Sequence, residues 1–166
     1  RKYLAPGLFG PCGYGLPAIV GAKIGQPDVP VVGFAGDGAF GIAVNELTAI
    51  GRGDWPPVTQ IVFRNYQWGA EKRNSTLWFE DNFVGTELDT SVSYAGIAKA
   101  CGLEGVAVRT MDELTDTLNK AINDQMKNGK TTLIEVMLNQ ELGEPFRRDA
   151  MKAPEKVAGI DLADML

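Results

Sequence analysis

Residues 29–41 read VPVVGFAGDGAFG, an apolar run that ends abruptly at the triplet Gly36-Asp37-Gly38. A near-continuous apolar stretch of this kind is typical of a parallel strand that is buried on both faces. The glycines permit a tight turn, and a helical rhythm of apolar residues follows over residues 41–51. The stretch therefore predicts a strand, a turn and a helix, which together open a β/α unit.

The same alternation continues along the chain. The helices that we expect cover residues 16–25, 41–51, 91–101 and 110–129, and the strands cover residues 29–35, 58–64, 106–109 and 131–138. Thr110 and Glu113 have the spacing of a capping box, which predicts the start of the last helix. Residues 65–89 show no clean period, so we expect a long, ordered and functional loop there. The fold class that follows is α/β, a doubly wound and mostly parallel sheet flanked by helices.

Composition excludes several classes of protein. The chain has 166 residues, of which 45% are hydrophobic and 22% are charged, as in a soluble folded domain. Its net charge of −5 argues against broad electrostatic binding of nucleic acid or of an anionic membrane. Histidine is absent, which excludes Ser-His-Asp and Cys-His catalysis and His-ligated zinc. Two distant cysteines, Cys12 and Cys101, do not make a disulfide framework, so we expect a reducing, cytoplasmic location.

Asp37 gives the turn its chemical character. Gly36-x-Gly38-x-x-Gly41 also matches the dinucleotide-binding fingerprint, a weak signal when it stands alone. A carboxylate in a phosphate-binding turn would repel the phosphate unless a cation lay between them, and Mg²⁺ is the natural mediator. Asn65 follows the next expected strand, 28 residues after Asp37, and offers an amide oxygen. We therefore expect the ends of the two strands to meet at one metal ion.

These pieces together resemble a known family. The GDG turn, the later Asn65 with its Trp68-Gly69 pair, and residues 10–17 (GPCGYGLP) resemble the cofactor motif of thiamine diphosphate-dependent enzymes. Residues 63–74 and 139–149 are similar to those of sulfoacetaldehyde acetyltransferases, and the resemblance covers essentially the whole chain.

The resemblance implies a set of binding residues. Asp37, Asn65 and the backbone carbonyl of Gln67 would ligate Mg²⁺. The implied cofactor-binding residues are Gly10, Cys12, Gly36, Asp37, Gly38, Ala39, Asn65, Gln67, Trp68 and Gly69. Within that set, the backbone amides of Gly38, Ala39, Trp68 and Gly69 would face the diphosphate. The Gly10 carbonyl would accept from the aminopyrimidine, and Cys12 would be the wedge under the cofactor. Cys12 departs from the bulkier Leu, Ile or Met of most relatives, and Arg64 replaces the first asparagine of the usual pair.

The resemblance also implies an activity and partners. The reaction would convert sulfoacetaldehyde and phosphate into acetyl phosphate and sulfite, a step of taurine and sulfonate catabolism. The activating glutamate would belong to a pyrimidine-binding domain of a neighbouring subunit, in a homodimer or homotetramer. We expect residues 1–143 to form the pyrophosphate-binding domain and residues 144–166 a C-terminal tail, with the pyrimidine-binding and central domains absent from this chain. The chain alone would then catalyse no reaction, and its sequence identifies no catalytic residue.

Three other interpretations stay open. An acetolactate synthase or decarboxylase would share the cofactor residues and differ in its substrate pocket. An NADP-dependent oxidoreductase would use the glycine fingerprint, with Arg64 holding a 2′-phosphate. A non-catalytic interaction module would bind no cofactor. Five cations are candidates to hold a sulfonate or phosphate, although a solvated surface charge is the plainer interpretation of each: Arg64, Lys72, Arg73, Arg147 and Arg148.

Overall fold

The computed structural model describes residues 2–142, 156–157 and 160–161. The chain divides into two compact units, and each is described by itself. The first unit comprises residues 1–66 and 88–139, and the second comprises residues 67–87 and 140–166.

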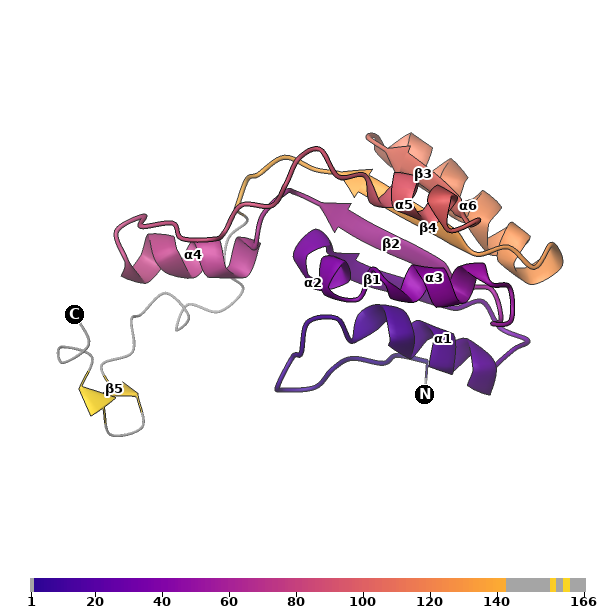
Figure 1. Cartoon of the computed structure of the whole chain (residues 1–166), viewed down its shortest axis with the longest axis horizontal. Coiled ribbons are helices and arrows are strands. Elements are labelled where there is room, and N and C mark those ends of the chain that lie inside the picture. Colours follow the sequence, from indigo (N-terminus) through magenta and orange to yellow (C-terminus); the bar gives the residue numbers. More distant parts are fainter. Residues whose placement is uncertain (1, 143–155, 158–159, 162–166) are drawn as a thin grey trace. The chain divides into compact units, whose positions relative to one another are not determined.

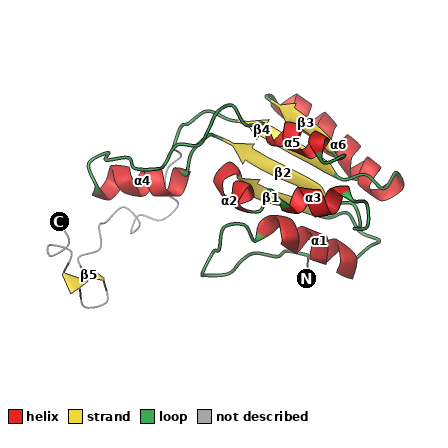
Figure 2. Ribbon diagram, in the orientation of Figure 1, coloured by secondary structure: helices red, strands yellow, loops and turns green. Residues whose placement is uncertain are grey.

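A parallel sheet of four strands forms the centre of the first unit (Figure 1). The strands are β1 (Val32–Gly36), β2 (Thr59–Arg64), β3 (Glu104–Val108) and β4 (Thr132–Met137). Their order across the sheet is β1-β2-β4-β3, and every neighbouring pair is parallel. Helices connect the strands (Figure 2), so the predicted α/β fold with a parallel sheet is confirmed.

Two apolar cores lie on the two faces of this sheet. The helices of the first unit are α1 (Gly15–Gly25), α2 (Asp37–Ile42), α3 (Glu46–Gly51), α5 (Tyr94–Ala100) and α6 (Met111–Lys127). One core joins residues of α1, α2, α3 and α5 with Val62 of β2, whereas the other joins α6 with Ile61 of β2. Adjacent residues of a strand point to opposite faces, so the sheet is covered on both sides. None of the helices in the described part of the chain is long and apolar enough to cross a membrane.

The first strand and the helix after it differ from expectation. The strand begins at Val32 rather than at residue 29. Pro30 has no N–H to donate, and the N–H of Val31 donates to the Gln125 side chain at 2.7 Å instead of to a strand. The helix begins directly at Asp37, with Gly36 in extended conformation at its N-cap, and a turn at residues 43–45 separates α2 from α3. The GDG triplet is therefore a helix start rather than a free turn.

The capping box before α6 is confirmed. The Thr110 hydroxyl accepts from the Glu113 N–H at 3.2 Å, and the Glu113 carboxylate accepts from the N–H groups of Thr110 and Arg109. The helix then presents Leu114 and Leu118 to the second core. The sequence located this helix because both its cap and its apolar face are local patterns.

We expect Thr110→Ala to weaken the N-terminal turn of α6 by about 1 kcal/mol, because the Glu113 amide loses its acceptor. Hydrogen exchange of the α6 amides measures the loss as faster exchange in the first turn. Thr115→Ala is the matched control, since its exposed hydroxyl only bonds back to the Met111 carbonyl within the helix. Equal exchange in the two variants would contradict the capping assignment.

The second unit contains a helix that the sequence did not indicate. Residues 69–78 form α4 (Gly69–Trp78) inside the stretch expected to be a loop, so that expectation was wrong. No residue of α4 is buried, which explains why the stretch lacks the apolar periodicity that marks a helix. This unit also contains the short antiparallel strands β5 (Lys156–Val157) and β6 (Ile160–Asp161). The expected boundary at residues 143 and 144 lies outside the described residues, as do Arg147 and Arg148.

Candidate functional site

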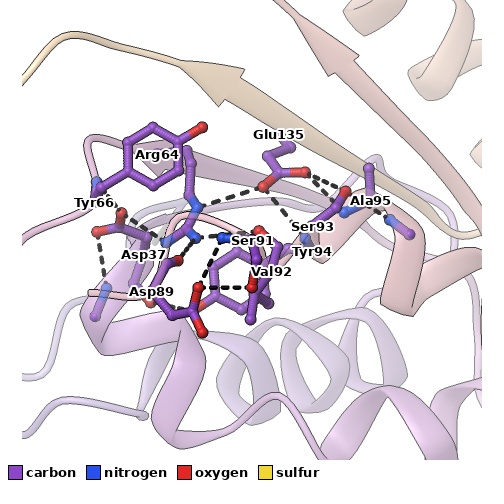
Figure 3. Close-up of polar contacts among 12 residues, drawn as sticks. Asp37, Arg64, Tyr66, Asp89, Ser91, Val92, Ser93, Tyr94, Ala95 and Glu135 are labelled. Carbon is purple, nitrogen blue, oxygen red and sulfur yellow. Dashed lines mark hydrogen bonds and ion pairs between the residues drawn. The ribbon is translucent and has the colours of Figure 1, made fainter.

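The carboxyl ends of β1 and β2 lie side by side. The two strands pair in parallel up to Gly36 and Phe63, so Asp37 and Arg64 leave the sheet next to each other. The Tyr66 N–H donates to Asp37 Oδ2 at 2.6 Å, which brings the peptide that follows Asn65 against the Asp37 carboxylate (Figure 3). The expectation that these two strand ends meet is confirmed. This edge is where open parallel sheets bind their ligands.

The Asp37 carboxylate is buried among donors. The residue is 1% exposed. Its Oδ1 accepts from the Gly38 N–H at 2.9 Å, and its Oδ2 accepts from Arg64 Nη1 at 3.2 Å as well as from Tyr66. A buried anion needs such partners, because burial removes the hydration that stabilises its charge. These hydrogen bonds therefore fix the Asp37 carboxylate oxygens in place at the end of the sheet.

Arg64 is a buried residue of this cluster and not a surface cation. Its side chain is 1% exposed, and Nη2 donates to the carbonyls of Asp89 and Val92 at 2.5 and 3.1 Å. The interpretations of Arg64 as a solvated charge, as a sulfonate ligand or as a 2′-phosphate ligand are wrong for this reason. The missed signal is that Arg64 ends a buried strand beside one that is followed directly by an aspartate.

Sequence reasoning also missed Glu135, an acidic residue within the apolar strand β4. Its carboxylate is 2% exposed and accepts from Ser93 Oγ, the Tyr94 N–H and the Ala95 N–H at 3.0 to 3.2 Å. The Tyr94 hydroxyl in turn donates to the Asp37 carbonyl at 3.0 Å. Burial raises the pKa of Tyr94, so the phenol keeps its proton. Glu135 thus fixes the first turn of α5, and Tyr94 connects that turn to Asp37.

Gly41 serves packing in this structure. A Cβ on Gly41 would lie 2.7 Å from Tyr94 Oη, so α2 approaches Tyr94 closely only because residue 41 has no side chain. In the dinucleotide reading this glycine is the third of the fingerprint. Gly41 is thus explained by its packing against Tyr94, and Arg64 is buried. Neither residue therefore supports an NADP site.

The loop that precedes α1 and contains Gly10, Cys12 and Gly13 belongs to the first unit. Gly10 and Cys12 are exposed, and Gly10 and Gly13 have φ angles of +58° and +89°. A Cβ on Gly13 would lie 2.9 Å from a methyl carbon of Ile42, so the loop passes close to the end of α2. Gly36, Gly38 and Ala39 lie around the start of α2. Gly36, Gly38 and Ala39 therefore lie together at the carboxyl end of β1, and the loop that contains Gly10 and Cys12 reaches the end of α2 at Gly13.

The remaining implied residues belong to the second unit. Gln67 is buried, and its Nε2 donates to the Gln140 carbonyl at 2.9 Å. The Trp68 N–H donates to the Thr86 carbonyl at 2.8 Å, and Gly69 begins α4. Lys72 pairs with Glu87.

The oxygen donors of the first unit fit a hard divalent cation. Asp37 would supply carboxylate oxygens, and Asn65, directly after β2, would supply an amide oxygen. Within the described part of the chain, no three His, Cys, Asp or Glu side chains group to hold a metal ion. A cation here would rest on one carboxylate with amide and carbonyl oxygens, as is usual for Mg²⁺ that also binds phosphate. The residues present therefore fit a magnesium diphosphate.

This fold and this arrangement of residues define a class of cofactor-binding domain. Residues 1–136 match the family described as the thiamine pyrophosphate enzyme, C-terminal TPP binding domain. The chain belongs to this family.

The chain is more similar to some individual proteins of this family than to others. The chain is 84% identical to a sulfoacetaldehyde acetyltransferase of Roseovarius nubinhibens over 99% of its length, and 78% identical to one of Rhodobacter capsulatus. It spans only about 27% and 28% of those two proteins. The large subunit of acetolactate synthase isozyme 2 of Escherichia coli is 30% identical over 74% of the chain and 22% of the relative. Among solved structures, a thiamine diphosphate-dependent 4-hydroxybenzoylformate decarboxylase of Rhodococcus jostii matches with a TM-score of 0.69, 29% identity, and coverage of 81% of this chain and 24% of that one.

Proposed function

We propose that this chain is the C-terminal cofactor-binding part of a thiamine diphosphate- and Mg²⁺-dependent sulfoacetaldehyde acetyltransferase. The enzyme converts sulfoacetaldehyde and phosphate into acetyl phosphate and sulfite. The observation that carries the proposal is the buried Asp37 carboxylate, held against the turn that follows Asn65 at adjoining strand ends. The 84% identity to a sulfoacetaldehyde acetyltransferase supports this substrate over the more distant acetolactate synthases.

Each binding residue has a proposed task. Asp37, Asn65 and the Gln67 carbonyl hold Mg²⁺, and the backbone amides at the starts of α2 and α4 hold the diphosphate. The Gly10 carbonyl orients the aminopyrimidine, and Cys12 supports the cofactor from below. The cofactor, when bound, supplies the carbanion chemistry, while the protein contributes binding and orientation.

The proposal includes partners. A pyrimidine-binding domain of a neighbouring subunit supplies the activating glutamate, so the enzyme is a homodimer or homotetramer. We also infer a cytoplasmic enzyme of sulfonate catabolism, for which the free thiols of Cys12 and Cys101 are suited.

Product analysis tests the substrate. The purified enzyme that contains this chain is incubated with sulfoacetaldehyde, phosphate, thiamine diphosphate and Mg²⁺, and acetyl phosphate and sulfite are measured. We expect both products in equal amounts and none without phosphate. Acetolactate formed from pyruvate, with no sulfite from sulfoacetaldehyde, would instead favour the acetolactate synthase type.

Calorimetric titration tests the cofactor separately. Thiamine diphosphate is added to the same enzyme in Mg²⁺ and then in EDTA, and we expect binding only in Mg²⁺. Absence of binding in both would reject the cofactor assignment and favour an interaction module.

A further inference from the structure

Arg64 is the centre of a buried polar cluster (Figure 3). Its Nη1 donates to Asp37 Oδ2, its Nη2 donates to the carbonyls of Asp89 and Val92, and its Nε lies 3.6 Å from Glu135 Oε1. The guanidinium thus joins the start of α2, the segment before α5 and strand β4. Its N–H groups point into the protein, so Arg64 acts on other protein groups and not on a substrate.

Stability alone is a weak reason for this arrangement. Arg64, Asp37 and Glu135 are each at most 2% exposed, so three charges have been taken out of water. Buried ion pairs are often no more stabilising than apolar residues of the same volume, because desolvation offsets the attraction. What a forked, planar guanidinium provides better than an apolar side chain is orientation of the oxygens that it contacts.

The cluster also holds the backbone turn that follows Asn65. Tyr66 has a φ angle of +62°, a left-handed conformation that is strained for an aromatic residue. Its N–H donates to Asp37, and its ring lies 4.3 Å below the Arg64 guanidinium. Such strain persists only where the surroundings determine the conformation. Arg64 therefore contacts both the Asp37 carboxylate and the strained residue next to Asn65.

We propose that Arg64 is a positioning residue for the cation site. It holds the Asp37 carboxylate through Oδ2, and it holds the turn at Tyr66, so that the oxygens of Asp37 and Asn65 are arranged before the cation binds. The inference rests on the proposed function, since the cation is the one that thiamine diphosphate requires. Arg64 acts through Asp37 and Tyr66 and does not itself touch cofactor or substrate.

The test measures Mg²⁺ affinity in the whole enzyme that contains this chain. Arg64→Lys keeps the charge and loses the fork, Arg64→Met loses both, and Arg52→Lys alters an exposed ion pair with Asp54 as the matched control. Mg²⁺ is titrated calorimetrically at saturating thiamine diphosphate, and kcat is measured at saturating Mg²⁺. We expect Mg²⁺ binding to weaken about 10- to 100-fold, more in Arg64→Met than in Arg64→Lys. In Arg64→Lys, kcat at saturating Mg²⁺ should stay within about twofold, because a saturating cation restores the arrangement.

Two results would overturn the inference. Unchanged Mg²⁺ affinity in Arg64→Lys would leave Arg64 a purely structural residue, and tighter affinity would make it a competitor of the cation.

If Arg64→Met does not fold, Arg64→Lys decides, since it keeps a cation between the two carboxylates. If the unsubstituted enzyme shows no Mg²⁺-dependent cofactor binding, the proposed function fails and this inference fails with it, whereas normal binding there isolates the role of Arg64.

Discussion

Replacing Asp37 with asparagine should weaken Mg²⁺-dependent binding of thiamine diphosphate by at least about 100-fold, because the substitution removes the carboxylate among the proposed metal ligands. The two side chains have nearly the same shape, so the change removes charge with little loss of volume. Calorimetric titration of the cofactor at fixed Mg²⁺ measures the effect. Raising the Mg²⁺ concentration should recover part of the affinity, since the amide oxygens that remain are weaker ligands.

The control for this experiment is Asp54→Asn. Asp54 is an exposed aspartate whose side chain pairs only loosely with Arg52, at 3.4 Å. This variant should bind the cofactor like the unsubstituted enzyme. Because Asp37 also neutralises Arg64, hydrogen exchange must establish that β1 and β2 stay folded in Asp37→Asn. A folded Asp37→Asn variant with normal cofactor affinity would contradict the assignment of Asp37 as a metal ligand.

The meeting of the two strand ends was predictable because its signals are local. A buried parallel strand is an apolar run, and the residues at its end can be read directly from the sequence. One such run ends just before Asp37 and the other ends at Arg64. Because parallel strands end at one edge of a sheet, these two runs were enough to predict that their ends adjoin. The resemblance added the identity of the group that we propose binds there.

The cluster around Arg64 was not predictable in the same way. It depends on the register of β2 with β4, in which Val62 lies opposite Glu135, and no local pattern encodes a pairing between residues so far apart. The helix α4 was missed for a different reason, because it has no buried face to produce a periodic pattern. Local signals thus located the strand ends, while the non-local contacts that orient their side chains required the structure.

Glu135 provides the strongest stability prediction. We expect Glu135→Ala to destabilise the first unit by about 3–5 kcal/mol, because it leaves three donors at the start of α5 without their buried acceptor. The variant also removes the second carboxylate near Arg64, which keeps Asp37 as its counter-charge. Urea denaturation followed by circular dichroism measures the loss, and hydrogen exchange should locate it in α5 and β4.

The matched control is Glu104→Ala. Glu104 also lies on a strand of this sheet and pairs with Lys130 at 2.9 Å, yet both side chains are about half exposed. Exposed ion pairs contribute little to stability, so this variant should unfold almost as the unsubstituted protein does. A similar loss in the two variants would mean that burial of the Glu135 cluster has no special weight.

Glu135→Gln separates the two causes of that loss. The glutamine keeps the size of the side chain and one acceptor oxygen, but it has no charge, and its NH₂ group would face N–H or O–H donors that now contact a carboxylate oxygen. The Arg64 Nε lies 3.6 Å from Glu135 Oε1, beyond hydrogen-bond distance, whereas the donors of α5 lie at 3.0 to 3.2 Å. The hydrogen bonds to α5 should therefore account for more of the stability than the ion pair. Glutamine can satisfy only some of these donors. We therefore expect the free energy of unfolding of Glu135→Gln to lie between those of the unsubstituted protein and Glu135→Ala, with faster hydrogen exchange confined to the first turn of α5. Full recovery of stability in Glu135→Gln would show instead that neither the charge nor the second acceptor oxygen is needed.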